Sequence, residues 1–326
     1  MRRIAIILAL GILLAPLAAD AQQAGKVPRV GWLGVGSAPA TVHLVEAFRQ
    51  GLRELGYVEG KDIVIEYRWA EGRFERLPDL AADLVRLKVD VILAVVQLAA
   101  LAAKDATKTI PIVTAAATDP VESGLVASLA RPGGNITGLT LTAGPEIVGK
   151  QLGLLKEAVP KVSRVAVLWN PTNPAAEPFL REVEGAARSL RLQLQLLEVR
   201  GPDEFESAFS AMTRGRAGAL LVLTDPMFFL HRTRLADFAT KSRLPAMLTF
   251  REYVEAGGLM GYAASLPDLW RRAPTFVDKI LKGTKPADLP MQQPTRFDLV
   301  INLKTAKAIG LTIPQSFLLR ADHVIQ

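Results

Sequence analysis

Two aspartates occupy matching places in the two halves of this 326-residue chain, and their type and spacing could do chemistry. Asp119 and Asp225 each follow an apolar stretch and directly precede a proline. Two carboxylates that face each other across a cleft could act as general acid and general base. The same side chains could instead cap helices or hold a cationic group of a ligand. The sequence leaves these alternatives open.

Small, hydroxyl and amide side chains accompany the aspartates at the ends of the predicted strands. N-caps and turns also select such residues, so local structure explains each of them as readily as binding does. Trp169 differs, because an aromatic ring has no capping role and could either stack on a ligand or pack within the protein. The candidate ligand-binding residues are Ser37, Gln97, Asp119, Trp169, Asn170, Asn173, Thr224, Asp225 and Thr249.

No catalytic residue, metal site or cofactor is expected. The chain has no cysteine, which excludes disulfides, thiol nucleophiles and cysteine-based metal sites, and it has only three histidines. Gly34 and Gly36 follow a predicted strand as in a dinucleotide-binding loop, but Pro39 stands where the third glycine belongs. Neither a Walker A sequence nor a nucleophile elbow occurs.

Short apolar runs alternate with helical patterns from Arg29 onward, which is typical of βαβ units and a parallel sheet. The first half has predicted strands at 30–33, 63–67, 91–95, 110–114 and 136–141, with helices near 42–55, 77–85, 98–107 and 121–130.

The second half repeats this plan after about 130 residues, which indicates two similar units in tandem. Strand 165–168 corresponds to 30–33, and the run 243–247 corresponds to 109–113, with a proline near the start of the strand in both. The predicted fold class is therefore α/β, with two similar doubly wound parallel-sheet lobes joined by a hinge. In such sheets ligands bind beyond the carboxyl ends of the strands, so we expect a small-molecule ligand in a cleft between the lobes.

The first residues are expected to be an export signal. Arg2 and Arg3 precede an apolar run, and Ala19-Asp20-Ala21 supplies the small residues that signal peptidase needs. The run is shorter than the about 20 apolar residues that span a bilayer. Residues 1–21 are therefore predicted to be a signal peptide cleaved after Ala21, which places the mature protein in the periplasm.

The basic residues do not form a nucleic-acid-binding pattern. The formal net charge is +7, and the densest cluster, residues 232–243, is best explained as the solvated face of one helix. No nucleic-acid partner is expected.

Long stretches of the chain closely resemble one family, the ABC transporter substrate-binding proteins often described as uncharacterised periplasmic components. The resemblance covers nearly all of the chain beyond the signal peptide. It is carried by residues 48–72, TDPVESGLVASLARPGGN at 118–135, VSRVAVLWNPTNP at 162–174, LPAMLTFREYVEAGGLMGYA at 244–263 and residues 277–325.

This resemblance implies a type I periplasmic binding protein fold, in which two lobes joined by three crossovers close on a ligand. It implies a first lobe of residues 28–140 plus 264–290 and a second of 141–263 plus 291–326, with a hinge near Thr140, Ala263 and Pro294. Studied members resemble amino-acid binders, including binders of aromatic amino acids. The implied partners are the small-molecule ligand and the membrane permease of an ABC transporter, with the protein itself a monomer.

One stretch departs from the family. Relatives commonly open the helix after the third strand with Gly-Ser/Thr-Pro, where this chain has Val95-Val96-Gln97-Leu98. The contact to the α-carboxylate of a ligand that the family implies at this helix start is therefore not carried over to this chain. It does match Ser37, Asp119, Asn170, Asn173 and Asp225 to cleft positions.

The sequence thus favours a periplasmic solute-binding component of an ABC importer that captures a small polar ligand such as an amino acid. One alternative is an exported α/β enzyme that acts on a phosphate- or nucleotide-like substrate through Asp119 and Asp225. Another is the effector half of a transcription regulator. The export signal argues against the regulator, because it occupies the place of a helix-turn-helix.

Overall fold

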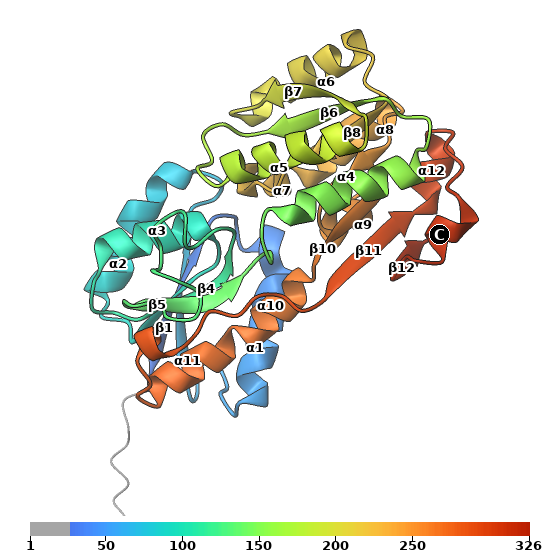
Figure 1. The fold of residues 1–326 in the computed structure, drawn as a ribbon. Coiled ribbons are helices and arrows are strands. Elements are labelled where there is room, and N and C mark those ends of the chain that lie inside the picture. The colour runs from blue at the N-terminus through green and yellow to red at the C-terminus, as the bar shows by residue number, and fades with distance from the viewer. Residues whose placement is uncertain (1–26) are drawn as a thin grey trace, which may run out of the picture.

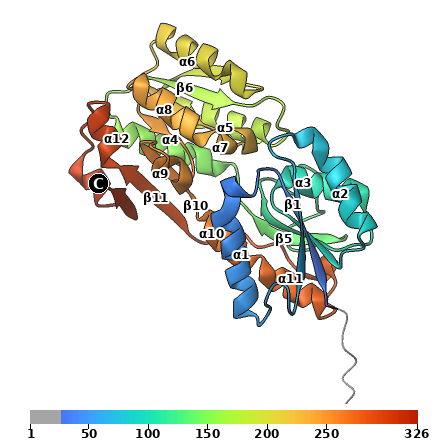
Figure 2. The same ribbon diagram turned by 180° about the vertical axis from the view of Figure 1, so that it is seen from behind.

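The computed structural model of the protein describes residues 27–326, so the predicted signal peptide lies outside the described part of the chain. Two α/β lobes lie side by side, each built on its own sheet (Figures 1 and 2). This confirms the predicted fold class. Within residues 27–326 every helix is too short or too polar to cross a membrane.

The first sheet has the strand order β2-β1-β3-β4-β5, and all its neighbouring strands are parallel. Helices cover both faces, which is why every residue of β3 and β4 is buried. The strands are β1 (Arg29–Gly34), β2 (Val64–Trp69), β3 (Val91–Ala94), β4 (Ile112–Ala117) and β5 (Ile136–Thr140). The helices near this sheet are α1 (Val42–Glu54), α2 (Leu77–Arg86), α3 (Gln97–Ala106), α10 (Leu266–Arg272) and α11 (Pro274–Leu281).

The second sheet has the order β12-β11-β10-β9-β8-β6-β7. Its strands run parallel except at the β10–β11 pair, which is antiparallel. Its strands are β6 (Arg164–Trp169), β7 (Gln193–Glu198), β8 (Ala219–Val222), β9 (Ala246–Met247), β10 (Met260–Ala264), β11 (Phe297–Asn302) and β12 (His323–Ile325). Its helices are α4 (Glu146–Ala158), α5 (Ala176–Ser189), α6 (Phe205–Arg214), α7 (Pro226–Leu230), α8 (Arg232–Lys241), α9 (Arg251–Glu255), α12 (Leu303–Ala308) and α13 (Gln315–Leu318).

The chain passes between the lobes three times, after β5, after β10 and before β11 (Figure 1). On its last visit to the first lobe it runs beside β5. Gln292 exchanges backbone hydrogen bonds with Gly138 and Thr140, and the Thr137 hydroxyl donates to the Leu289 carbonyl at 2.6 Å. The first sheet is thus completed by a segment that follows most of the second lobe in sequence.

A glycine allows α10 to pack closely on α1. A Cβ atom added at Gly51 would lie only 2.1 Å from the backbone oxygen of Arg271, so α10 fits only where α1 has no side chain. Farther along, the Tyr57 hydroxyl bonds the Asp278 carboxylate of α11 at 2.9 Å. These contacts anchor α10 and α11 to the first lobe.

The helix predicted near residues 121–130 is wrong, because this segment consists of turns. The Asp119 side chain accepts the Glu122 N–H, and Gly124 has a φ of 67°, a left-handed conformation that ends any helix. Leu125 and Val126 still bury their side chains in the core of the first lobe. The apolar spacing therefore correctly indicated that these side chains are buried. The backbone conformation, however, is determined by the turn-forming residues of the segment.

Candidate ligand-binding site

A cavity lies between the lobes, where the carboxyl ends of the strands of both sheets meet. Residues after β1, β3 and β4 line it from the first lobe, and residues after β6, β8 and β9 line it from the second. Leu266 and Trp270 of α10 complete the wall. The position agrees with the expectation for facing doubly wound sheets.

Aromatic rings from both lobes form much of the wall. Trp32 and Trp69 lie 5.6 Å apart, and Phe229 and Phe250 lie 5.9 Å apart in an edge-to-face arrangement. The cavity volume is about 80 Å³. Benzene needs roughly 150 Å³ in a comparable apolar cavity, so these walls must separate to admit a ligand of amino-acid size.

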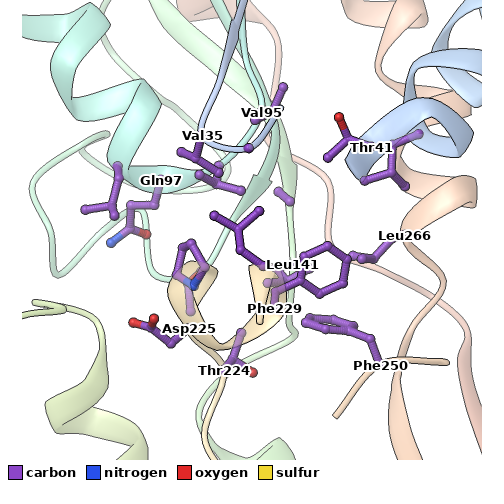
Figure 3. A pocket seen from close by; sticks show the side chains of 18 of the residues that line it. Val35, Thr41, Val95, Gln97, Leu141, Thr224, Asp225, Phe229, Phe250 and Leu266 are labelled. Carbon is purple, nitrogen blue, oxygen red and sulfur yellow. The ribbon is translucent and has the colours of Figure 1, made fainter. Parts of the chain in front are cut away.

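The Gln97 amide and the Asp225 carboxylate lie at one end of the cavity. Figure 3 shows the Gln97 amide and the Asp225 carboxylate on that side, and Phe229, Phe250 and Leu266 on the other. A ligand with one charged end and one apolar end would match this division.

Asp225 is held by four N–H donors. One carboxylate oxygen accepts from the backbone N–H groups of Met227 (2.8 Å) and Phe228 (3.4 Å), which makes Asp225 the N-cap of α7. The other accepts from the side-chain amides of Asn173 (2.9 Å) and Asn170 (3.2 Å). The prediction that this residue caps a helix is confirmed.

Asp225 is 4% exposed, and its carboxylate forms no ion pair with a Lys or Arg among residues 27–326. Burial raises its pKa above the usual value, while the hydrogen bonds from Asn173 and the other donors act to lower it. A buried carboxylate that lines a cavity without a cationic partner can be compensated by a cation within that cavity.

Gln97 opens α3 from the first lobe. Its side-chain oxygen accepts the Asp119 N–H at 2.6 Å, which fixes the orientation of the amide. Its Nε2 has no acceptor within residues 27–326, although the side chain is 4% exposed and lines the cavity. No side chain caps α3, so the first-turn N–H groups of the helix lie beside this free amide donor.

Four of the nine predicted binding residues line the cavity, and the other five do not. Asn170 contacts Asp225 from behind, while Thr249 is buried and donates its hydroxyl to the Val222 carbonyl at 3.0 Å. Trp169 packs against the core of the second lobe. The four lining residues are Gln97, Asn173, Thr224 and Asp225.

Ser37 and Asp119 lie in loops of the first lobe. The Ser37 carbonyl accepts the hydroxyl of Thr41 at 2.9 Å, and the Asp119 carboxylate accepts the Glu122 N–H at 3.2 Å. Of the two aspartates, only Asp225 lines the cavity. The cavity wall therefore has no pair of opposed aspartates that could act as general acid and base.

The aromatic wall of the cavity was not predicted from the sequence. Trp69 ends β2 and Phe250 follows β9, so both stand at strand ends where a ligand was expected. That position was a signal in the sequence. Trp270 and Leu266 gave none, because they reach the cavity only through the packing of α10 on α1.

The sequence model described as ABC transporter substrate binding protein matches residues 30–325. The chain belongs to this family. It is therefore the substrate-binding protein of an ABC transporter, a class that acts outside the cytoplasm, takes a small-molecule ligand, works with a membrane permease and is not enzymatic. This decides against the alternative of an exported enzyme.

Individual relatives agree with this assignment. The substrate-binding protein is 27% identical over 266 residues to a tyrosine-binding protein of Clostridioides difficile (strain R20291), covering 82% of this chain and 76% of the relative. A leucine binding protein from Thermotoga maritima, 18% identical with a TM-score of 0.54 over 80% of this chain and 77% of that one, shares the type I periplasmic binding protein fold.

Two solved structures bear on the arrangement of the lobes. The ABC domain from Streptococcus pneumoniae in complex with L-Trp is 28% identical with a TM-score of 0.85, covering 91% of this chain and 99% of that one. The second is the ligand-free, open structure of a substrate binding protein with adhesive properties from Clostridium difficile. It is 25% identical with a TM-score of 0.69, covering 92% of this chain and 100% of that one. The substrate-binding protein therefore superposes more closely as a whole on the L-Trp complex than on the open, ligand-free structure.

Proposed function

We propose that this substrate-binding protein captures an α-amino acid with an apolar, aromatic side chain. The observation that carries the proposal is the buried Asp225 carboxylate, which lacks a cationic partner and lines an apolar cavity that also contains the free Gln97 amide. The relative that binds tyrosine and the structure that holds L-Trp support this ligand class.

The ligand ammonium group is assigned to Asp225. Its four N–H donors hold the carboxylate in one orientation, and an ammonium group would supply the missing positive charge. Asn173 and Thr224 line the cavity beside it and offer further polar contacts. Asn170 and Thr249 support this end from behind.

The ligand carboxylate is assigned to Gln97 Nε2 and the N-terminus of α3. Both offer N–H donors without protein acceptors, and the helix dipole adds a favourable field for an anion. Gln97 thus replaces the Ser/Thr hydroxyl that the family resemblance places at this helix start. The side chain of the ligand then lies among Trp32, Trp69, Phe229 and Phe250, where aromatic packing favours a ring.

Such a ligand bridges the lobes, because Gln97 belongs to the first lobe and Asp225 belongs to the second lobe. Binding then favours the state in which both ends are satisfied, and closure follows as a hinge motion at the three crossovers near Thr140, Ala263 and Pro294. The hinge divides residues 28–140 plus 264–290 from 141–263 plus 291–326.

The proposed place of action is the periplasm, after cleavage behind Ala21, where the monomeric protein hands its ligand to the permease and binds no nucleic acid. Three features support this. The Ala19-Asp20-Ala21 sequence suits signal peptidase, the family acts outside the cytoplasm, and the chain has no concentrated basic patch.

Isothermal titration calorimetry with L-tyrosine, L-tryptophan, L-phenylalanine, tyramine and N-acetyl-L-tyrosine tests the ligand assignment. Tight binding of a free aromatic amino acid is expected, with at least a hundredfold loss for tyramine and for N-acetyl-L-tyrosine, because each lacks one charged end. Absence of binding by all three amino acids would refute the proposal.

Asp225→Ser tests the ammonium site, because serine can still cap α7 but carries no charge. Binding of the preferred amino acid should fall at least a hundredfold while the thermal unfolding temperature changes little. Asp237→Asn is the control, because Asp237 is exposed on α8 and far from the cavity wall, so it should bind as the wild type does. Equal affinities in Asp225→Ser and wild type would contradict the assignment.

A further inference from the structure

Leu230, the last residue of α7, contacts the opposite lobe at two glycines. A Cβ atom placed on Gly36 would lie 3.0 Å from Cδ2 of Leu230, and one on Gly72 would lie 3.6 Å from Cδ1. The Leu230 side chain therefore fills space that any other residue at Gly36 would partly occupy. Gly36 and Gly72 follow β1 and β2 in the first lobe, so this contact crosses the cleft.

The two glycines form one rigid surface. The Gly36 carbonyl accepts the Glu71 N–H at 2.9 Å, and the Val35 carbonyl accepts the Gly72 N–H at 2.8 Å. The loops after β1 and β2 are thus hydrogen-bonded to each other through consecutive residues. We call Gly36 and Gly72 with this backbone the glycine socket.

Helix α7 couples the socket to the polar end of the cavity. Its N-cap is Asp225, and Leu230 is the last of its five residues. The cap bonds of Asp225 fix the start of the helix, so a shift of the carboxylate would also move Leu230. Buried apolar side chains continue from one lobe to the other in a single cluster that includes Met227 and Phe228 of this helix.

We propose that Leu230 and the glycine socket form a closure latch, a contact that stabilises the closed arrangement of the lobes even when the cavity is empty. Leu230 is thereby a positioning residue for binding: it sets how long the lobes stay together. Leu230 is half-buried and lines the cavity together with Gly36. The apolar surface that it removes from water against the opposite lobe favours closure, while the missing Cβ atoms allow the approach. The proposal concerns lobe closure and does not depend on which small molecule the cavity takes.

The latch predicts a shift between closed and open populations that can be measured without a ligand. The chain has no cysteine, so Asp79→Cys on α2 and Ser210→Cys on α6 introduce two unique labelling sites, one on each lobe, at exposed positions. Electron-spin distance measurements on the ligand-free protein should show a closed population. Leu230→Ala and Gly36→Ala should each reduce the closed-to-open ratio about tenfold.

The two substitutions should not act independently if they affect one contact. Gly36 has an ordinary backbone conformation, so an alanine causes no backbone strain there. The free-energy cost of Gly36→Ala comes from crowding Leu230 and, within its own lobe, the Thr41 methyl group at 3.3 Å. In the Leu230→Ala background the added methyl group meets more space, and its effect on the closed-to-open ratio should shrink severalfold. Gly134→Ala is the control, because a Cβ there meets nothing within 4 Å.

The kinetics of ligand release give a second readout. With L-tyrosine or L-tryptophan as probe, Leu230→Ala should raise the dissociation rate more than it changes the association rate. An absent closed population in the ligand-free wild type, unchanged distances in both variants, or fully additive effects in the double variant would each overturn the latch. Failure of every amino acid to bind would refute the proposed function and leave the distance experiment valid.

Discussion

The side-chain amide of Asn173 donates a 2.9 Å hydrogen bond to the carboxylate of Asp225, and this bond joins the loop after β6 to the start of α7. Asn173 is the strongest influence that opposes the effect of burial on the Asp225 pKa. The amide therefore helps to keep a buried carboxylate ionised in a cavity where charge is costly.

Asn173→Ala should weaken binding of an amino acid about tenfold at pH 7, which corresponds to the loss of one hydrogen bond to a charged group. The remaining donors to Asp225 would stabilise its ionised form less well, and its pKa would rise. Calorimetry with L-tyrosine and L-tryptophan measures the change. As a control, Asn135→Ala removes an amide that bonds the Thr107 and Ile110 carbonyls far from the cavity, so it should lower stability without affecting affinity.

The stability of the ligand-free protein should depend on the charge of Asp225. Its pKa in the folded state lies above the ordinary value of 3.8. The folded protein therefore binds this proton more tightly than the unfolded chain does, and the resulting stabilisation is present at low pH and lost as pH rises through the folded-state pKa. Denaturant unfolding of wild type and Asp225→Ser from pH 3.5 to 7 should show the wild type losing stability relative to the variant as pH rises. A constant difference would contradict this.

Gln97→Glu should remove the preference for ligands that carry a carboxylate over ligands that lack one. The new carboxylate can still accept the Asp119 N–H, but it replaces a donor with a negative charge at the start of α3. Affinity for L-tyrosine should fall about a hundredfold, and tyramine, which lacks the carboxylate, should lose far less. Gln50→Glu on the exposed side of α1 is the matched control and should leave both affinities unchanged. Equal losses for the two compounds would argue that Gln97 does not face the ligand carboxylate.

Gly51→Ala should destabilise the protein, although alanine usually favours a helix over glycine by about 1 kcal/mol. The new methyl group would lie 2.1 Å from the backbone oxygen of Arg271, so α10 must move away from α1 at a cost of about 1–3 kcal/mol or more. Gly153→Ala in α4 meets nothing within 4 Å and should stabilise the protein slightly. Thermal and urea unfolding of the two variants decide the matter, and similar effects would refute the role of this close approach.

Much of the fold could be predicted because the strands are recognisable in the sequence. The buried strands β3, β4, β6 and β8 are short apolar runs bounded by polar turns, and both halves repeat the same order. Asp225 could be placed at the cleft because it directly follows the loop after a strand. The segment 121–130 misled the prediction, since apolar spacing alone does not distinguish a helix from turns that bury the same side chains.

The aromatic wall and the closure latch could not be predicted by local reasoning. Trp270 reaches the cavity through the contact of α10 with Gly51, which lies more than 200 residues earlier in the chain. The proposed role of Leu230 depends on its packing against Gly36 and Gly72, which belong to the other lobe. Neither the spacing nor the type of these residues reveals such partners, because only tertiary packing brings them together.

The segment that completes the first sheet has a consequence for how the protein matures. Thr137 bonds to a residue 152 positions later, and Tyr57 bonds to one 221 positions later. Until synthesis reaches Gln292, the amino-terminal half lacks the helices α10 and α11 and its last sheet neighbour, and such distant pairings form slowly. The contacts that join the two ends of the first lobe can therefore form only when the chain is almost fully synthesised.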